Sequence, residues 1–278
     1  MSYAAVGIVA GAPASDRQEN PMLGTRFRTG SPVWIDLGSP DTATAAAFYS
    51  AVFGWTYETA GPESSGYGVF RKGDRTVGAV GRLTERGARS AWMTYFRSDD
   101  VEATARAVVA AGGTVRAEPM SMGDSSMAQF TDPQGAQFAV LKSDQGLERA
   151  AEDDTLLWVE LHTEDPEAAI HFYSGLFGWR SEVMQAPGMT YRVLSLAEGD
   201  RQQTAFGGVA EHRGEPEGVR WVPYFAVADA DASADLVRSH GGTVVMPASD
   251  VPEVGRIAWL ADPCEAVFAV LKPNPRQA

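Results

Sequence analysis

Alternating apolar and polar residues predict a strand near the start of the chain, and the same strand returns 124 residues later. In the segment VWIDL, which begins at Val33, Trp34 and Asp36 would share one face of the strand. The segment LWVEL places Trp158 and Glu160 at the corresponding positions. The opposite face is apolar in both copies, which is typical of a strand with one face in a core.

Each strand is followed by the pattern of an amphipathic helix. Asp41 and Asp165 are placed to cap the helix N-termini, and apolar residues then recur at spacings that form one stripe. Both helices contain the motif FYxxxFGW, whose glycines, Gly54 and Gly178, predict the helix ends. We expect the two stripes to pack against a sheet.

The rest of each copy repeats the same order of elements. Residues 91–113 and 220–242 again predict a strand and a capped helix that ends in Gly-Gly. Residues 130–142 and 260–272 share an Asp-Pro turn followed by an alternating strand. Each copy is therefore strand–helix–strands repeated twice. Two paired modules would form a curved, cup-like sheet with helices outside, which is an α+β fold.

The repeat also predicts the domain organisation. We expect a flexible leader at 1–29, a first domain at 30–142, a polar linker at 143–154 and a second domain at 155–273.

Composition limits the classes of function. The formal net charge of −13 argues against a nucleic-acid partner, which would require a basic surface. The single cysteine, Cys264, rules out an intrachain disulfide framework and suits a reducing compartment. No apolar run reaches membrane length, and no basic residue precedes the apolar start. We therefore expect a cytoplasmic protein without a membrane partner.

The motifs resemble those of a known family. The pattern DxxxAxxFYxxxFGW at 41–55 and 165–179, the strand–helix–Gly-Gly segments and the endings in FAVLK are similar to those of the vicinal oxygen chelate superfamily. This superfamily is also called glyoxalase/bleomycin resistance/dioxygenase. The resemblance implies tandem glyoxalase-like domains, each built from paired βαβββ modules. It is nearest to two-domain members that are loosely labelled hydroxylases or glyoxalase-like proteins.

In the members of that family that use a metal, His, Glu or Gln side chains on several strands hold a divalent ion in each cup. The chain has four histidines, of which His171 and His240 fall on predicted helices. We therefore expect no metal and no cofactor, since the family's ligand positions carry side chains that do not suit a hard cation. By the resemblance, these positions are Trp34, Met93 and Ala139 in the first copy and Trp158, Val222 and Ala269 in the second.

The cups are expected instead to bind a ligand through aromatic and polar walls, because an indole or phenol ring can stack on a flat conjugated molecule. Asp36, Glu160 and His162 are candidate acid–base groups, since a carboxyl group on an apolar wall can have a shifted pKa. Two simpler interpretations stay open: the tryptophans fill space, and the carboxylates form salt bridges with Arg97 or Arg192. The expected ligand-binding residues are Trp34, Tyr67, Met93, Tyr95, Arg97, Gln129, Gln137, Trp158, Tyr191, Tyr224 and Trp259.

Three hypotheses for the function follow, in order of preference. The first is a metal-independent protein that binds a planar hydrophobic molecule, of antibiotic or polyketide type, for sequestration or biosynthetic processing. The second is a metal-free isomerase, cyclase, lyase or hydroxylase that uses Asp36, Glu160 or His162. The third is a divalent-metal lyase or dioxygenase with ligands at other positions. The expected partner is the small molecule, and the chain is expected to be a monomer or a homodimer.

Overall fold

The computed structural model describes residues 24–61, 66–84, 87–186, 189–212 and 218–275. Two eight-stranded sheets, each with two helices, account for most of these residues. The elements of domain 1 are β1 (Pro32–Ser39), α1 (Thr42–Phe53), β2 (Thr56–Thr59), β3 (Gly68–Lys72), β4 (Arg75–Arg82), β5 (Ala91–Arg97), α2 (Val101–Ala110), β6 (Thr114–Met122), β7 (Ser125–Thr131) and β8 (Gln137–Lys142). Those of domain 2 are β9 (Leu156–Thr163), α3 (Pro166–Phe177), β10 (Arg180–Ala186), β11 (Met189–Ser195), β12 (Ala205–Glu211), β13 (Arg220–Ala226), α4 (Ala230–Ser239), β14 (Thr243–Val251), β15 (Gly255–Ala261) and β16 (Val267–Pro273).

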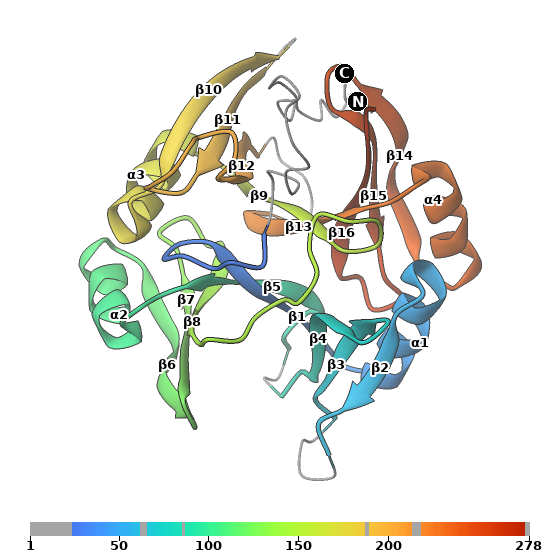
Figure 1. Ribbon diagram of the computed structural model, residues 1–278, viewed down its shortest axis with the longest axis horizontal. Helices are drawn as coiled ribbons and strands as arrows, with labels where there is room; N and C mark the ends of the chain where they lie inside the picture. The colour runs from blue at the N-terminus through green and yellow to red at the C-terminus, as the bar shows by residue number, and fades with distance from the viewer. Residues whose placement is uncertain (1–23, 62–65, 85–86, 187–188, 213–217, 276–278) are drawn as a thin grey trace.

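The two sheets have the same topology, which confirms the α+β fold of tandem domains built from paired βαβββ modules. The strand orders are β2-β3-β4-β1-β5-β8-β7-β6 and β10-β11-β12-β9-β13-β16-β15-β14. In each sheet an antiparallel pair joins the two modules, β1 with β5 and β9 with β13. The sheets lie back to back and their concave faces open in opposite directions, with α1 and α4 on one side and α2 and α3 on the other (Figure 1).

The helix ends follow the sequence signals. The Asp41 carboxylate accepts hydrogen bonds from the backbone N–H groups of Ala43 and Thr44, and Asp165 caps α3 in the same way. Both helices end at the glycine of the FGW motif, and Gly54 has a φ of 68°. A residue with a Cβ is strained in that left-handed conformation, which explains why glycine stops the helix there.

The tryptophans of the two FGW motifs join the domains. The Trp55 indole N–H donates to the backbone oxygen of Asp154, at 2.8 Å. The Trp179 indole N–H donates to the backbone oxygen of Gly30, at 2.9 Å. Gly30 and Asp154 each lie just before the first strand of the other domain, and both have a positive φ. The tryptophan of each motif therefore holds the backbone just before the first strand of the opposite domain, and does not serve to bind a ligand.

The tyrosines of the same motif make a second pair of contacts between domains. The Tyr173 hydroxyl donates to Asp132 Oδ2 at 3.1 Å, and the Tyr49 hydroxyl donates to Asp262 Oδ2 at 3.4 Å. Both aspartates belong to the Asp-Pro turns. Because residues of both domains share one buried apolar cluster, the repeats form a common core.

The segments on either side of domain 1 are attached to it. Leu147, in the expected linker, is buried, and its N–H donates to the backbone oxygen of Val33. The expected leader lies outside the described residues up to residue 23. Phe27 packs against the concave face of domain 1, and the Thr29 hydroxyl donates to Asp99. Phe27 and Thr29, within the expected leader, therefore contact domain 1.

Among the residues that the structure describes, no helix is both long and apolar enough to cross a membrane.

Candidate functional site

Four strands bring the candidate residues of domain 1 onto one concave face, called here the domain 1 cup. Trp34 of β1 lies opposite Tyr95 of β5, and Asp36 lies opposite Met93. Tyr95 and Gln129 each lie opposite Ala139 of β8. The side chains on one face alternate with those that enter the core, so the sequence pattern already places this set together.

Asp36 is the carboxyl group of the domain 1 cup. The Tyr95 hydroxyl donates a hydrogen bond to Asp36 Oδ2 at 2.9 Å. Burial raises the pKa of Asp36 to about 6, and the hydrogen bond from Tyr95 opposes this shift in part. Tyr67 lies close enough that burial and the Asp36 charge raise the pKa of its hydroxyl to about 12, against a smaller opposing effect of Trp34.

The equivalent face of domain 2, called here the domain 2 cup, holds a closed hydrogen-bond network around Glu160. The hydroxyl groups of Tyr191 and Tyr224 donate to its two oxygens at 2.9 and 2.7 Å. His162 Nε2 lies 2.7 Å from Oε1 and donates when it carries the proton. The indole N–H groups of Trp158 and Trp259 donate to the two phenol oxygens at 3.0 and 3.2 Å.

This network is buried and holds the carboxylate ionised. The five side chains Trp158, Glu160, Tyr191, Tyr224 and Trp259 are each exposed by 7% or less. Although burial acts to raise the pKa of Glu160, the hydrogen bonds from His162, Tyr224 and Tyr191 and the charge of His162 hold it below its usual range. The predicted ligand-binding residues of domain 2 thus satisfy one another's hydrogen bonds. A ligand could bind to them only by breaking these bonds.

The two cups differ at the residue paired with the acid, which is glycine in domain 2 and alanine in domain 1. In domain 2 the Tyr191 ring lies over Gly208, which is paired with Glu160; a Cβ on Gly208 would lie 1.9 Å from the Tyr191 hydroxyl oxygen. In domain 1 the residue paired with Asp36 is Ala79, and the Tyr67 ring lies instead over Gly81. The tyrosine therefore bonds to the carboxylate in domain 2, whereas in domain 1 no such bond joins Tyr67 to Asp36 among the described residues.

Both predicted salt bridges are wrong. Arg97 lies 3.6 Å from Asp99 and donates to the backbone oxygen of Ser143. Arg192 pairs with Glu167 on α3. Among the described residues, neither arginine is bonded to Asp36 or Glu160, because each pairs with a surface carboxylate or a backbone carbonyl instead.

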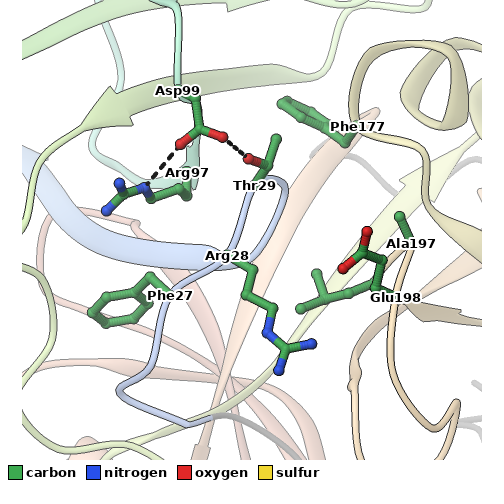
Figure 2. A pocket seen from close by; sticks show the side chains of 9 residues that line it. Phe27, Arg28, Thr29, Arg97, Asp99, Phe177, Ala197 and Glu198 are labelled. Carbon is green, nitrogen blue, oxygen red and sulfur yellow. Dashed lines mark hydrogen bonds and ion pairs between the residues drawn. The ribbon is translucent and has the colours of Figure 1, made fainter.

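Arg97 lines a different cavity, of about 350 Å³, between the N-terminal segment and the two domains. Figure 2 shows Asp99 bonded to both Arg97 and Thr29 on one side of it. Arg97 and Asp99 neutralise each other. This cavity therefore presents less unpaired charge to a small molecule than the domain 1 cup does. Its other lining residues are Phe27, Thr29, Phe177, Leu196 and Ala197.

The outer wall of the domain 1 cup is apolar in a way that the sequence prediction missed. Met120 of β6 lies opposite Met127 of β7, and Met120 and Met122 are about half exposed. Met93 and Met127 pack against the same small cluster of the cup, and such thioether side chains adapt to different ligand shapes. The alternation of residues 125–131 could have identified Met127, which shares a face with Gln129. Gln137 is exposed at the rim and accepts a hydrogen bond from Arg116.

The residues at the family's metal positions do not fit a divalent cation. Indole, thioether, methyl and isopropyl groups at these positions offer no hard oxygen or nitrogen ligand. Within the described residues there is also no group of three or more His, Cys, Asp or Glu side chains placed to hold a metal ion. The residues are Trp34, Met93 and Ala139 in domain 1 and Trp158, Val222 and Ala269 in domain 2.

Comparison with known proteins places both repeats in one family. The model described as Glyoxalase/Bleomycin resistance protein/Dioxygenase superfamily matches residues 31–140 and 155–270. The putative glyoxylase CFP32 of Mycobacterium tuberculosis is 36% identical over 266 residues, which are 91% of this chain and 98% of that protein. The anthracycline biosynthesis protein DnrV of Streptomyces peucetius is 34% identical over 270 residues, 89% of this chain and 95% of that protein.

Solved structures share the fold. The Mn(II)-bound glyoxalase from Novosphingobium aromaticivorans superposes with a TM-score of 0.60 at 16% identity, covering 90% of this chain and 86% of that chain. The dioxygenase LapB from Pseudomonas sp. KL28 gives 0.62 at 13% identity, covering 90% and 95%. At such identities the likeness extends to the fold and not to the chemistry.

Proposed function

Because the chain belongs to the glyoxalase/bleomycin resistance/dioxygenase superfamily, we propose that it binds a planar, hydrophobic, conjugated small molecule in the domain 1 cup. Binding is independent of a metal, and it serves sequestration or biosynthetic processing of the molecule. Two relatives are named for anthracycline biosynthesis, and an anthracycline is a fused-ring conjugated molecule of this class.

The observation that carries the proposal is a set of aromatic rings without ring partners. Trp34 and Tyr67 are partly exposed on the concave face, and the hydroxyl of the buried Tyr95 donates to Asp36. Among the described residues, none of these three rings stacks on another ring, although aromatic contacts are dense in the core and Trp259 contacts both His162 and Tyr224. A flat ligand would supply a stacking partner for the two partly exposed rings, Trp34 and Tyr67.

We expect Trp34→Ala to weaken binding of the anthraquinone quinizarin, used as a probe, by at least about tenfold, because a central aromatic anchor is lost. The measurement is a fluorescence titration of protein treated with a chelator. Trp158→Phe, at the equivalent position of domain 2, is the matched control and should keep the wild-type affinity.

Unchanged affinity in Trp34→Ala would remove the domain 1 cup as the binding site. Binding that returns only after a divalent metal is added back would contradict metal independence.

A second candidate function is a metal-free enzyme, and the raised pKa of Asp36 favours it. A carboxyl group with a pKa of about 6 can take or give a proton near neutral pH. The titratable groups that face it are Tyr67 and Tyr95, and burial raises the pKa of both, so that they stay neutral there.

For any compound that displaces quinizarin and is converted by the wild type, we expect Asp36→Asn to lower the conversion rate by about 100-fold. Conversion is followed by mass spectrometry across pH. If Asp36 is the base, the rate rises with pH through about 6, where the carboxyl group ionises. Recovery of every displacing compound unchanged would leave binding as the function.

The same variant tests the pKa without a substrate. Since the pKa of Asp36 rises from 3.8 in the unfolded chain to about 6 in the folded protein, the folded state holds the proton more tightly. Relative to Asp36→Asn, the wild type should therefore lose stability to urea as pH rises from 3.8 to about 6.

A further inference from the structure

The carboxylate of the domain 1 cup has no positive partner among the described residues. Asp36 accepts its hydrogen bond from the neutral hydroxyl of Tyr95. Arg97, which lies on β5 beyond Met93 and Tyr95, is bonded to Asp99 and Ser143. The cup therefore holds a negative charge in a partly dry place, where an ionised group is stable only with a counter-charge.

In the equivalent place of domain 2 the chain itself sets a histidine against the acid. His162 lies two residues after Glu160 on the same strand face and reaches its carboxylate at 2.7 Å. In domain 1 the residue two positions after Asp36 is Gly38, and the apolar side chain of Leu83 lies over it. The duplicated site thus keeps its acid in both copies, and among the described residues only the acid of domain 2 has a histidine against it.

Aromatic rings surround the unpaired carboxylate. Tyr95 is bonded to it, Tyr67 lies within range of its charge, and Trp34 precedes it by two residues on the same face. The faces of indole and phenol rings attract cations, and the attraction is larger when the cation is shielded from water. An acid among such rings is a site for an organic cation rather than for a bare metal ion.

We propose that the ligand of the domain 1 cup carries a protonated amine on or beside its flat conjugated skeleton, and that this amine is bound by Asp36 among Trp34, Tyr67 and Tyr95. The inference rests on the proposed function of the same cup and adds the chemical class that it selects. The net charge of −13 would further favour the approach of a cation.

The test compares two probes of equal shape. Naphthylmethylamine is a cation near neutral pH, and naphthylmethanol is its neutral analogue that can still donate a hydrogen bond. We expect the wild type to bind the amine at least about tenfold more tightly than the alcohol, measured by calorimetry. Asp36→Asn should abolish this preference while both probes still bind. Glu160→Gln, the matched change in domain 2, should leave it unchanged.

Equal affinity of the wild type for the two probes would overturn the cation site and leave the cup as a binder of flat molecules. A preference for the amine that survives in Asp36→Asn would also overturn the cation site, since a group other than Asp36 would then bind the ammonium group. If neither probe nor quinizarin binds, the proposed function itself fails.

Discussion

Glu160→Ala is expected to lower the free energy of unfolding by roughly 3–5 kcal/mol, because it removes the shared acceptor of a buried network. The hydroxyl groups of Tyr191 and Tyr224 and the His162 ring all bond to this one carboxylate. Without it, two buried hydroxyl donors and the partly buried His162 ring lose their shared partner together. Urea denaturation followed by circular dichroism measures the loss.

Two further variants give stability changes to compare with that of Glu160→Ala. Glu160→Gln keeps one oxygen acceptor and should lose less than Glu160→Ala. Asp36→Asn, at the equivalent position of domain 1, should keep or increase the stability near neutral pH, because it relieves a carboxylate whose ionised form is disfavoured by burial. Equal losses in the two domains would contradict the difference that we describe between the cups.

The pH dependence of the Glu160 effect has the opposite sign to that of Asp36. The pKa of Glu160 is lower in the folded protein than its ordinary value of 4.5. Its contribution to stability is therefore present above about 4.5 and is lost as pH falls through the lowered pKa. The gap between wild type and Glu160→Ala should close in acid. If Glu160 were instead a catalytic group of domain 2, its replacement should change turnover and not stability.

Trp179→Ala is expected to destabilise the whole chain by about 3–5 kcal/mol, because it removes a large side chain from the core that the domains share. Trp179 is 4% exposed. Its ring lies 4.9 Å from Phe96 of domain 1 and 4.9 Å from Phe206 of domain 2, and it bonds to Gly30. Because the damage falls on both domains, tryptophan fluorescence and circular dichroism should report one transition at a lower urea concentration.

Trp179→Phe separates packing from hydrogen bonding. It keeps an aromatic ring in the cluster but loses the bond to the backbone oxygen of Gly30, so it should cost less than Trp179→Ala. Two separate transitions in the wild type would contradict a common core. Trp55→Phe, the equivalent change in domain 1, should behave like Trp179→Phe, since Trp55 bonds to Asp154 in the same way.

The sequence determined the helices, the strands and the face on which each candidate residue lies. Asp41 and Gly54 mark the ends of the first helix because capping and left-handed φ are local properties. Trp34 and Asp36 lie on the concave face because strand alternation is local as well. These signals depend on a few neighbouring residues, so one sequence is enough to read them.

The tertiary structure decided what those residues contact, since contacts depend on residues far apart in the chain. The sequence treated Asp36 and Glu160 as equivalents, but the Gly208 position lets Tyr191 reach Glu160, while Ala79 and Gly38 leave Asp36 with fewer partners. The sequence also predicted Arg97 as a ligand-binding residue of the cup, but Arg97 pairs with Asp99 and lines a different cavity. A hydrogen bond forms only when two groups reach the right distance, and the packing of the two folded domains sets that distance.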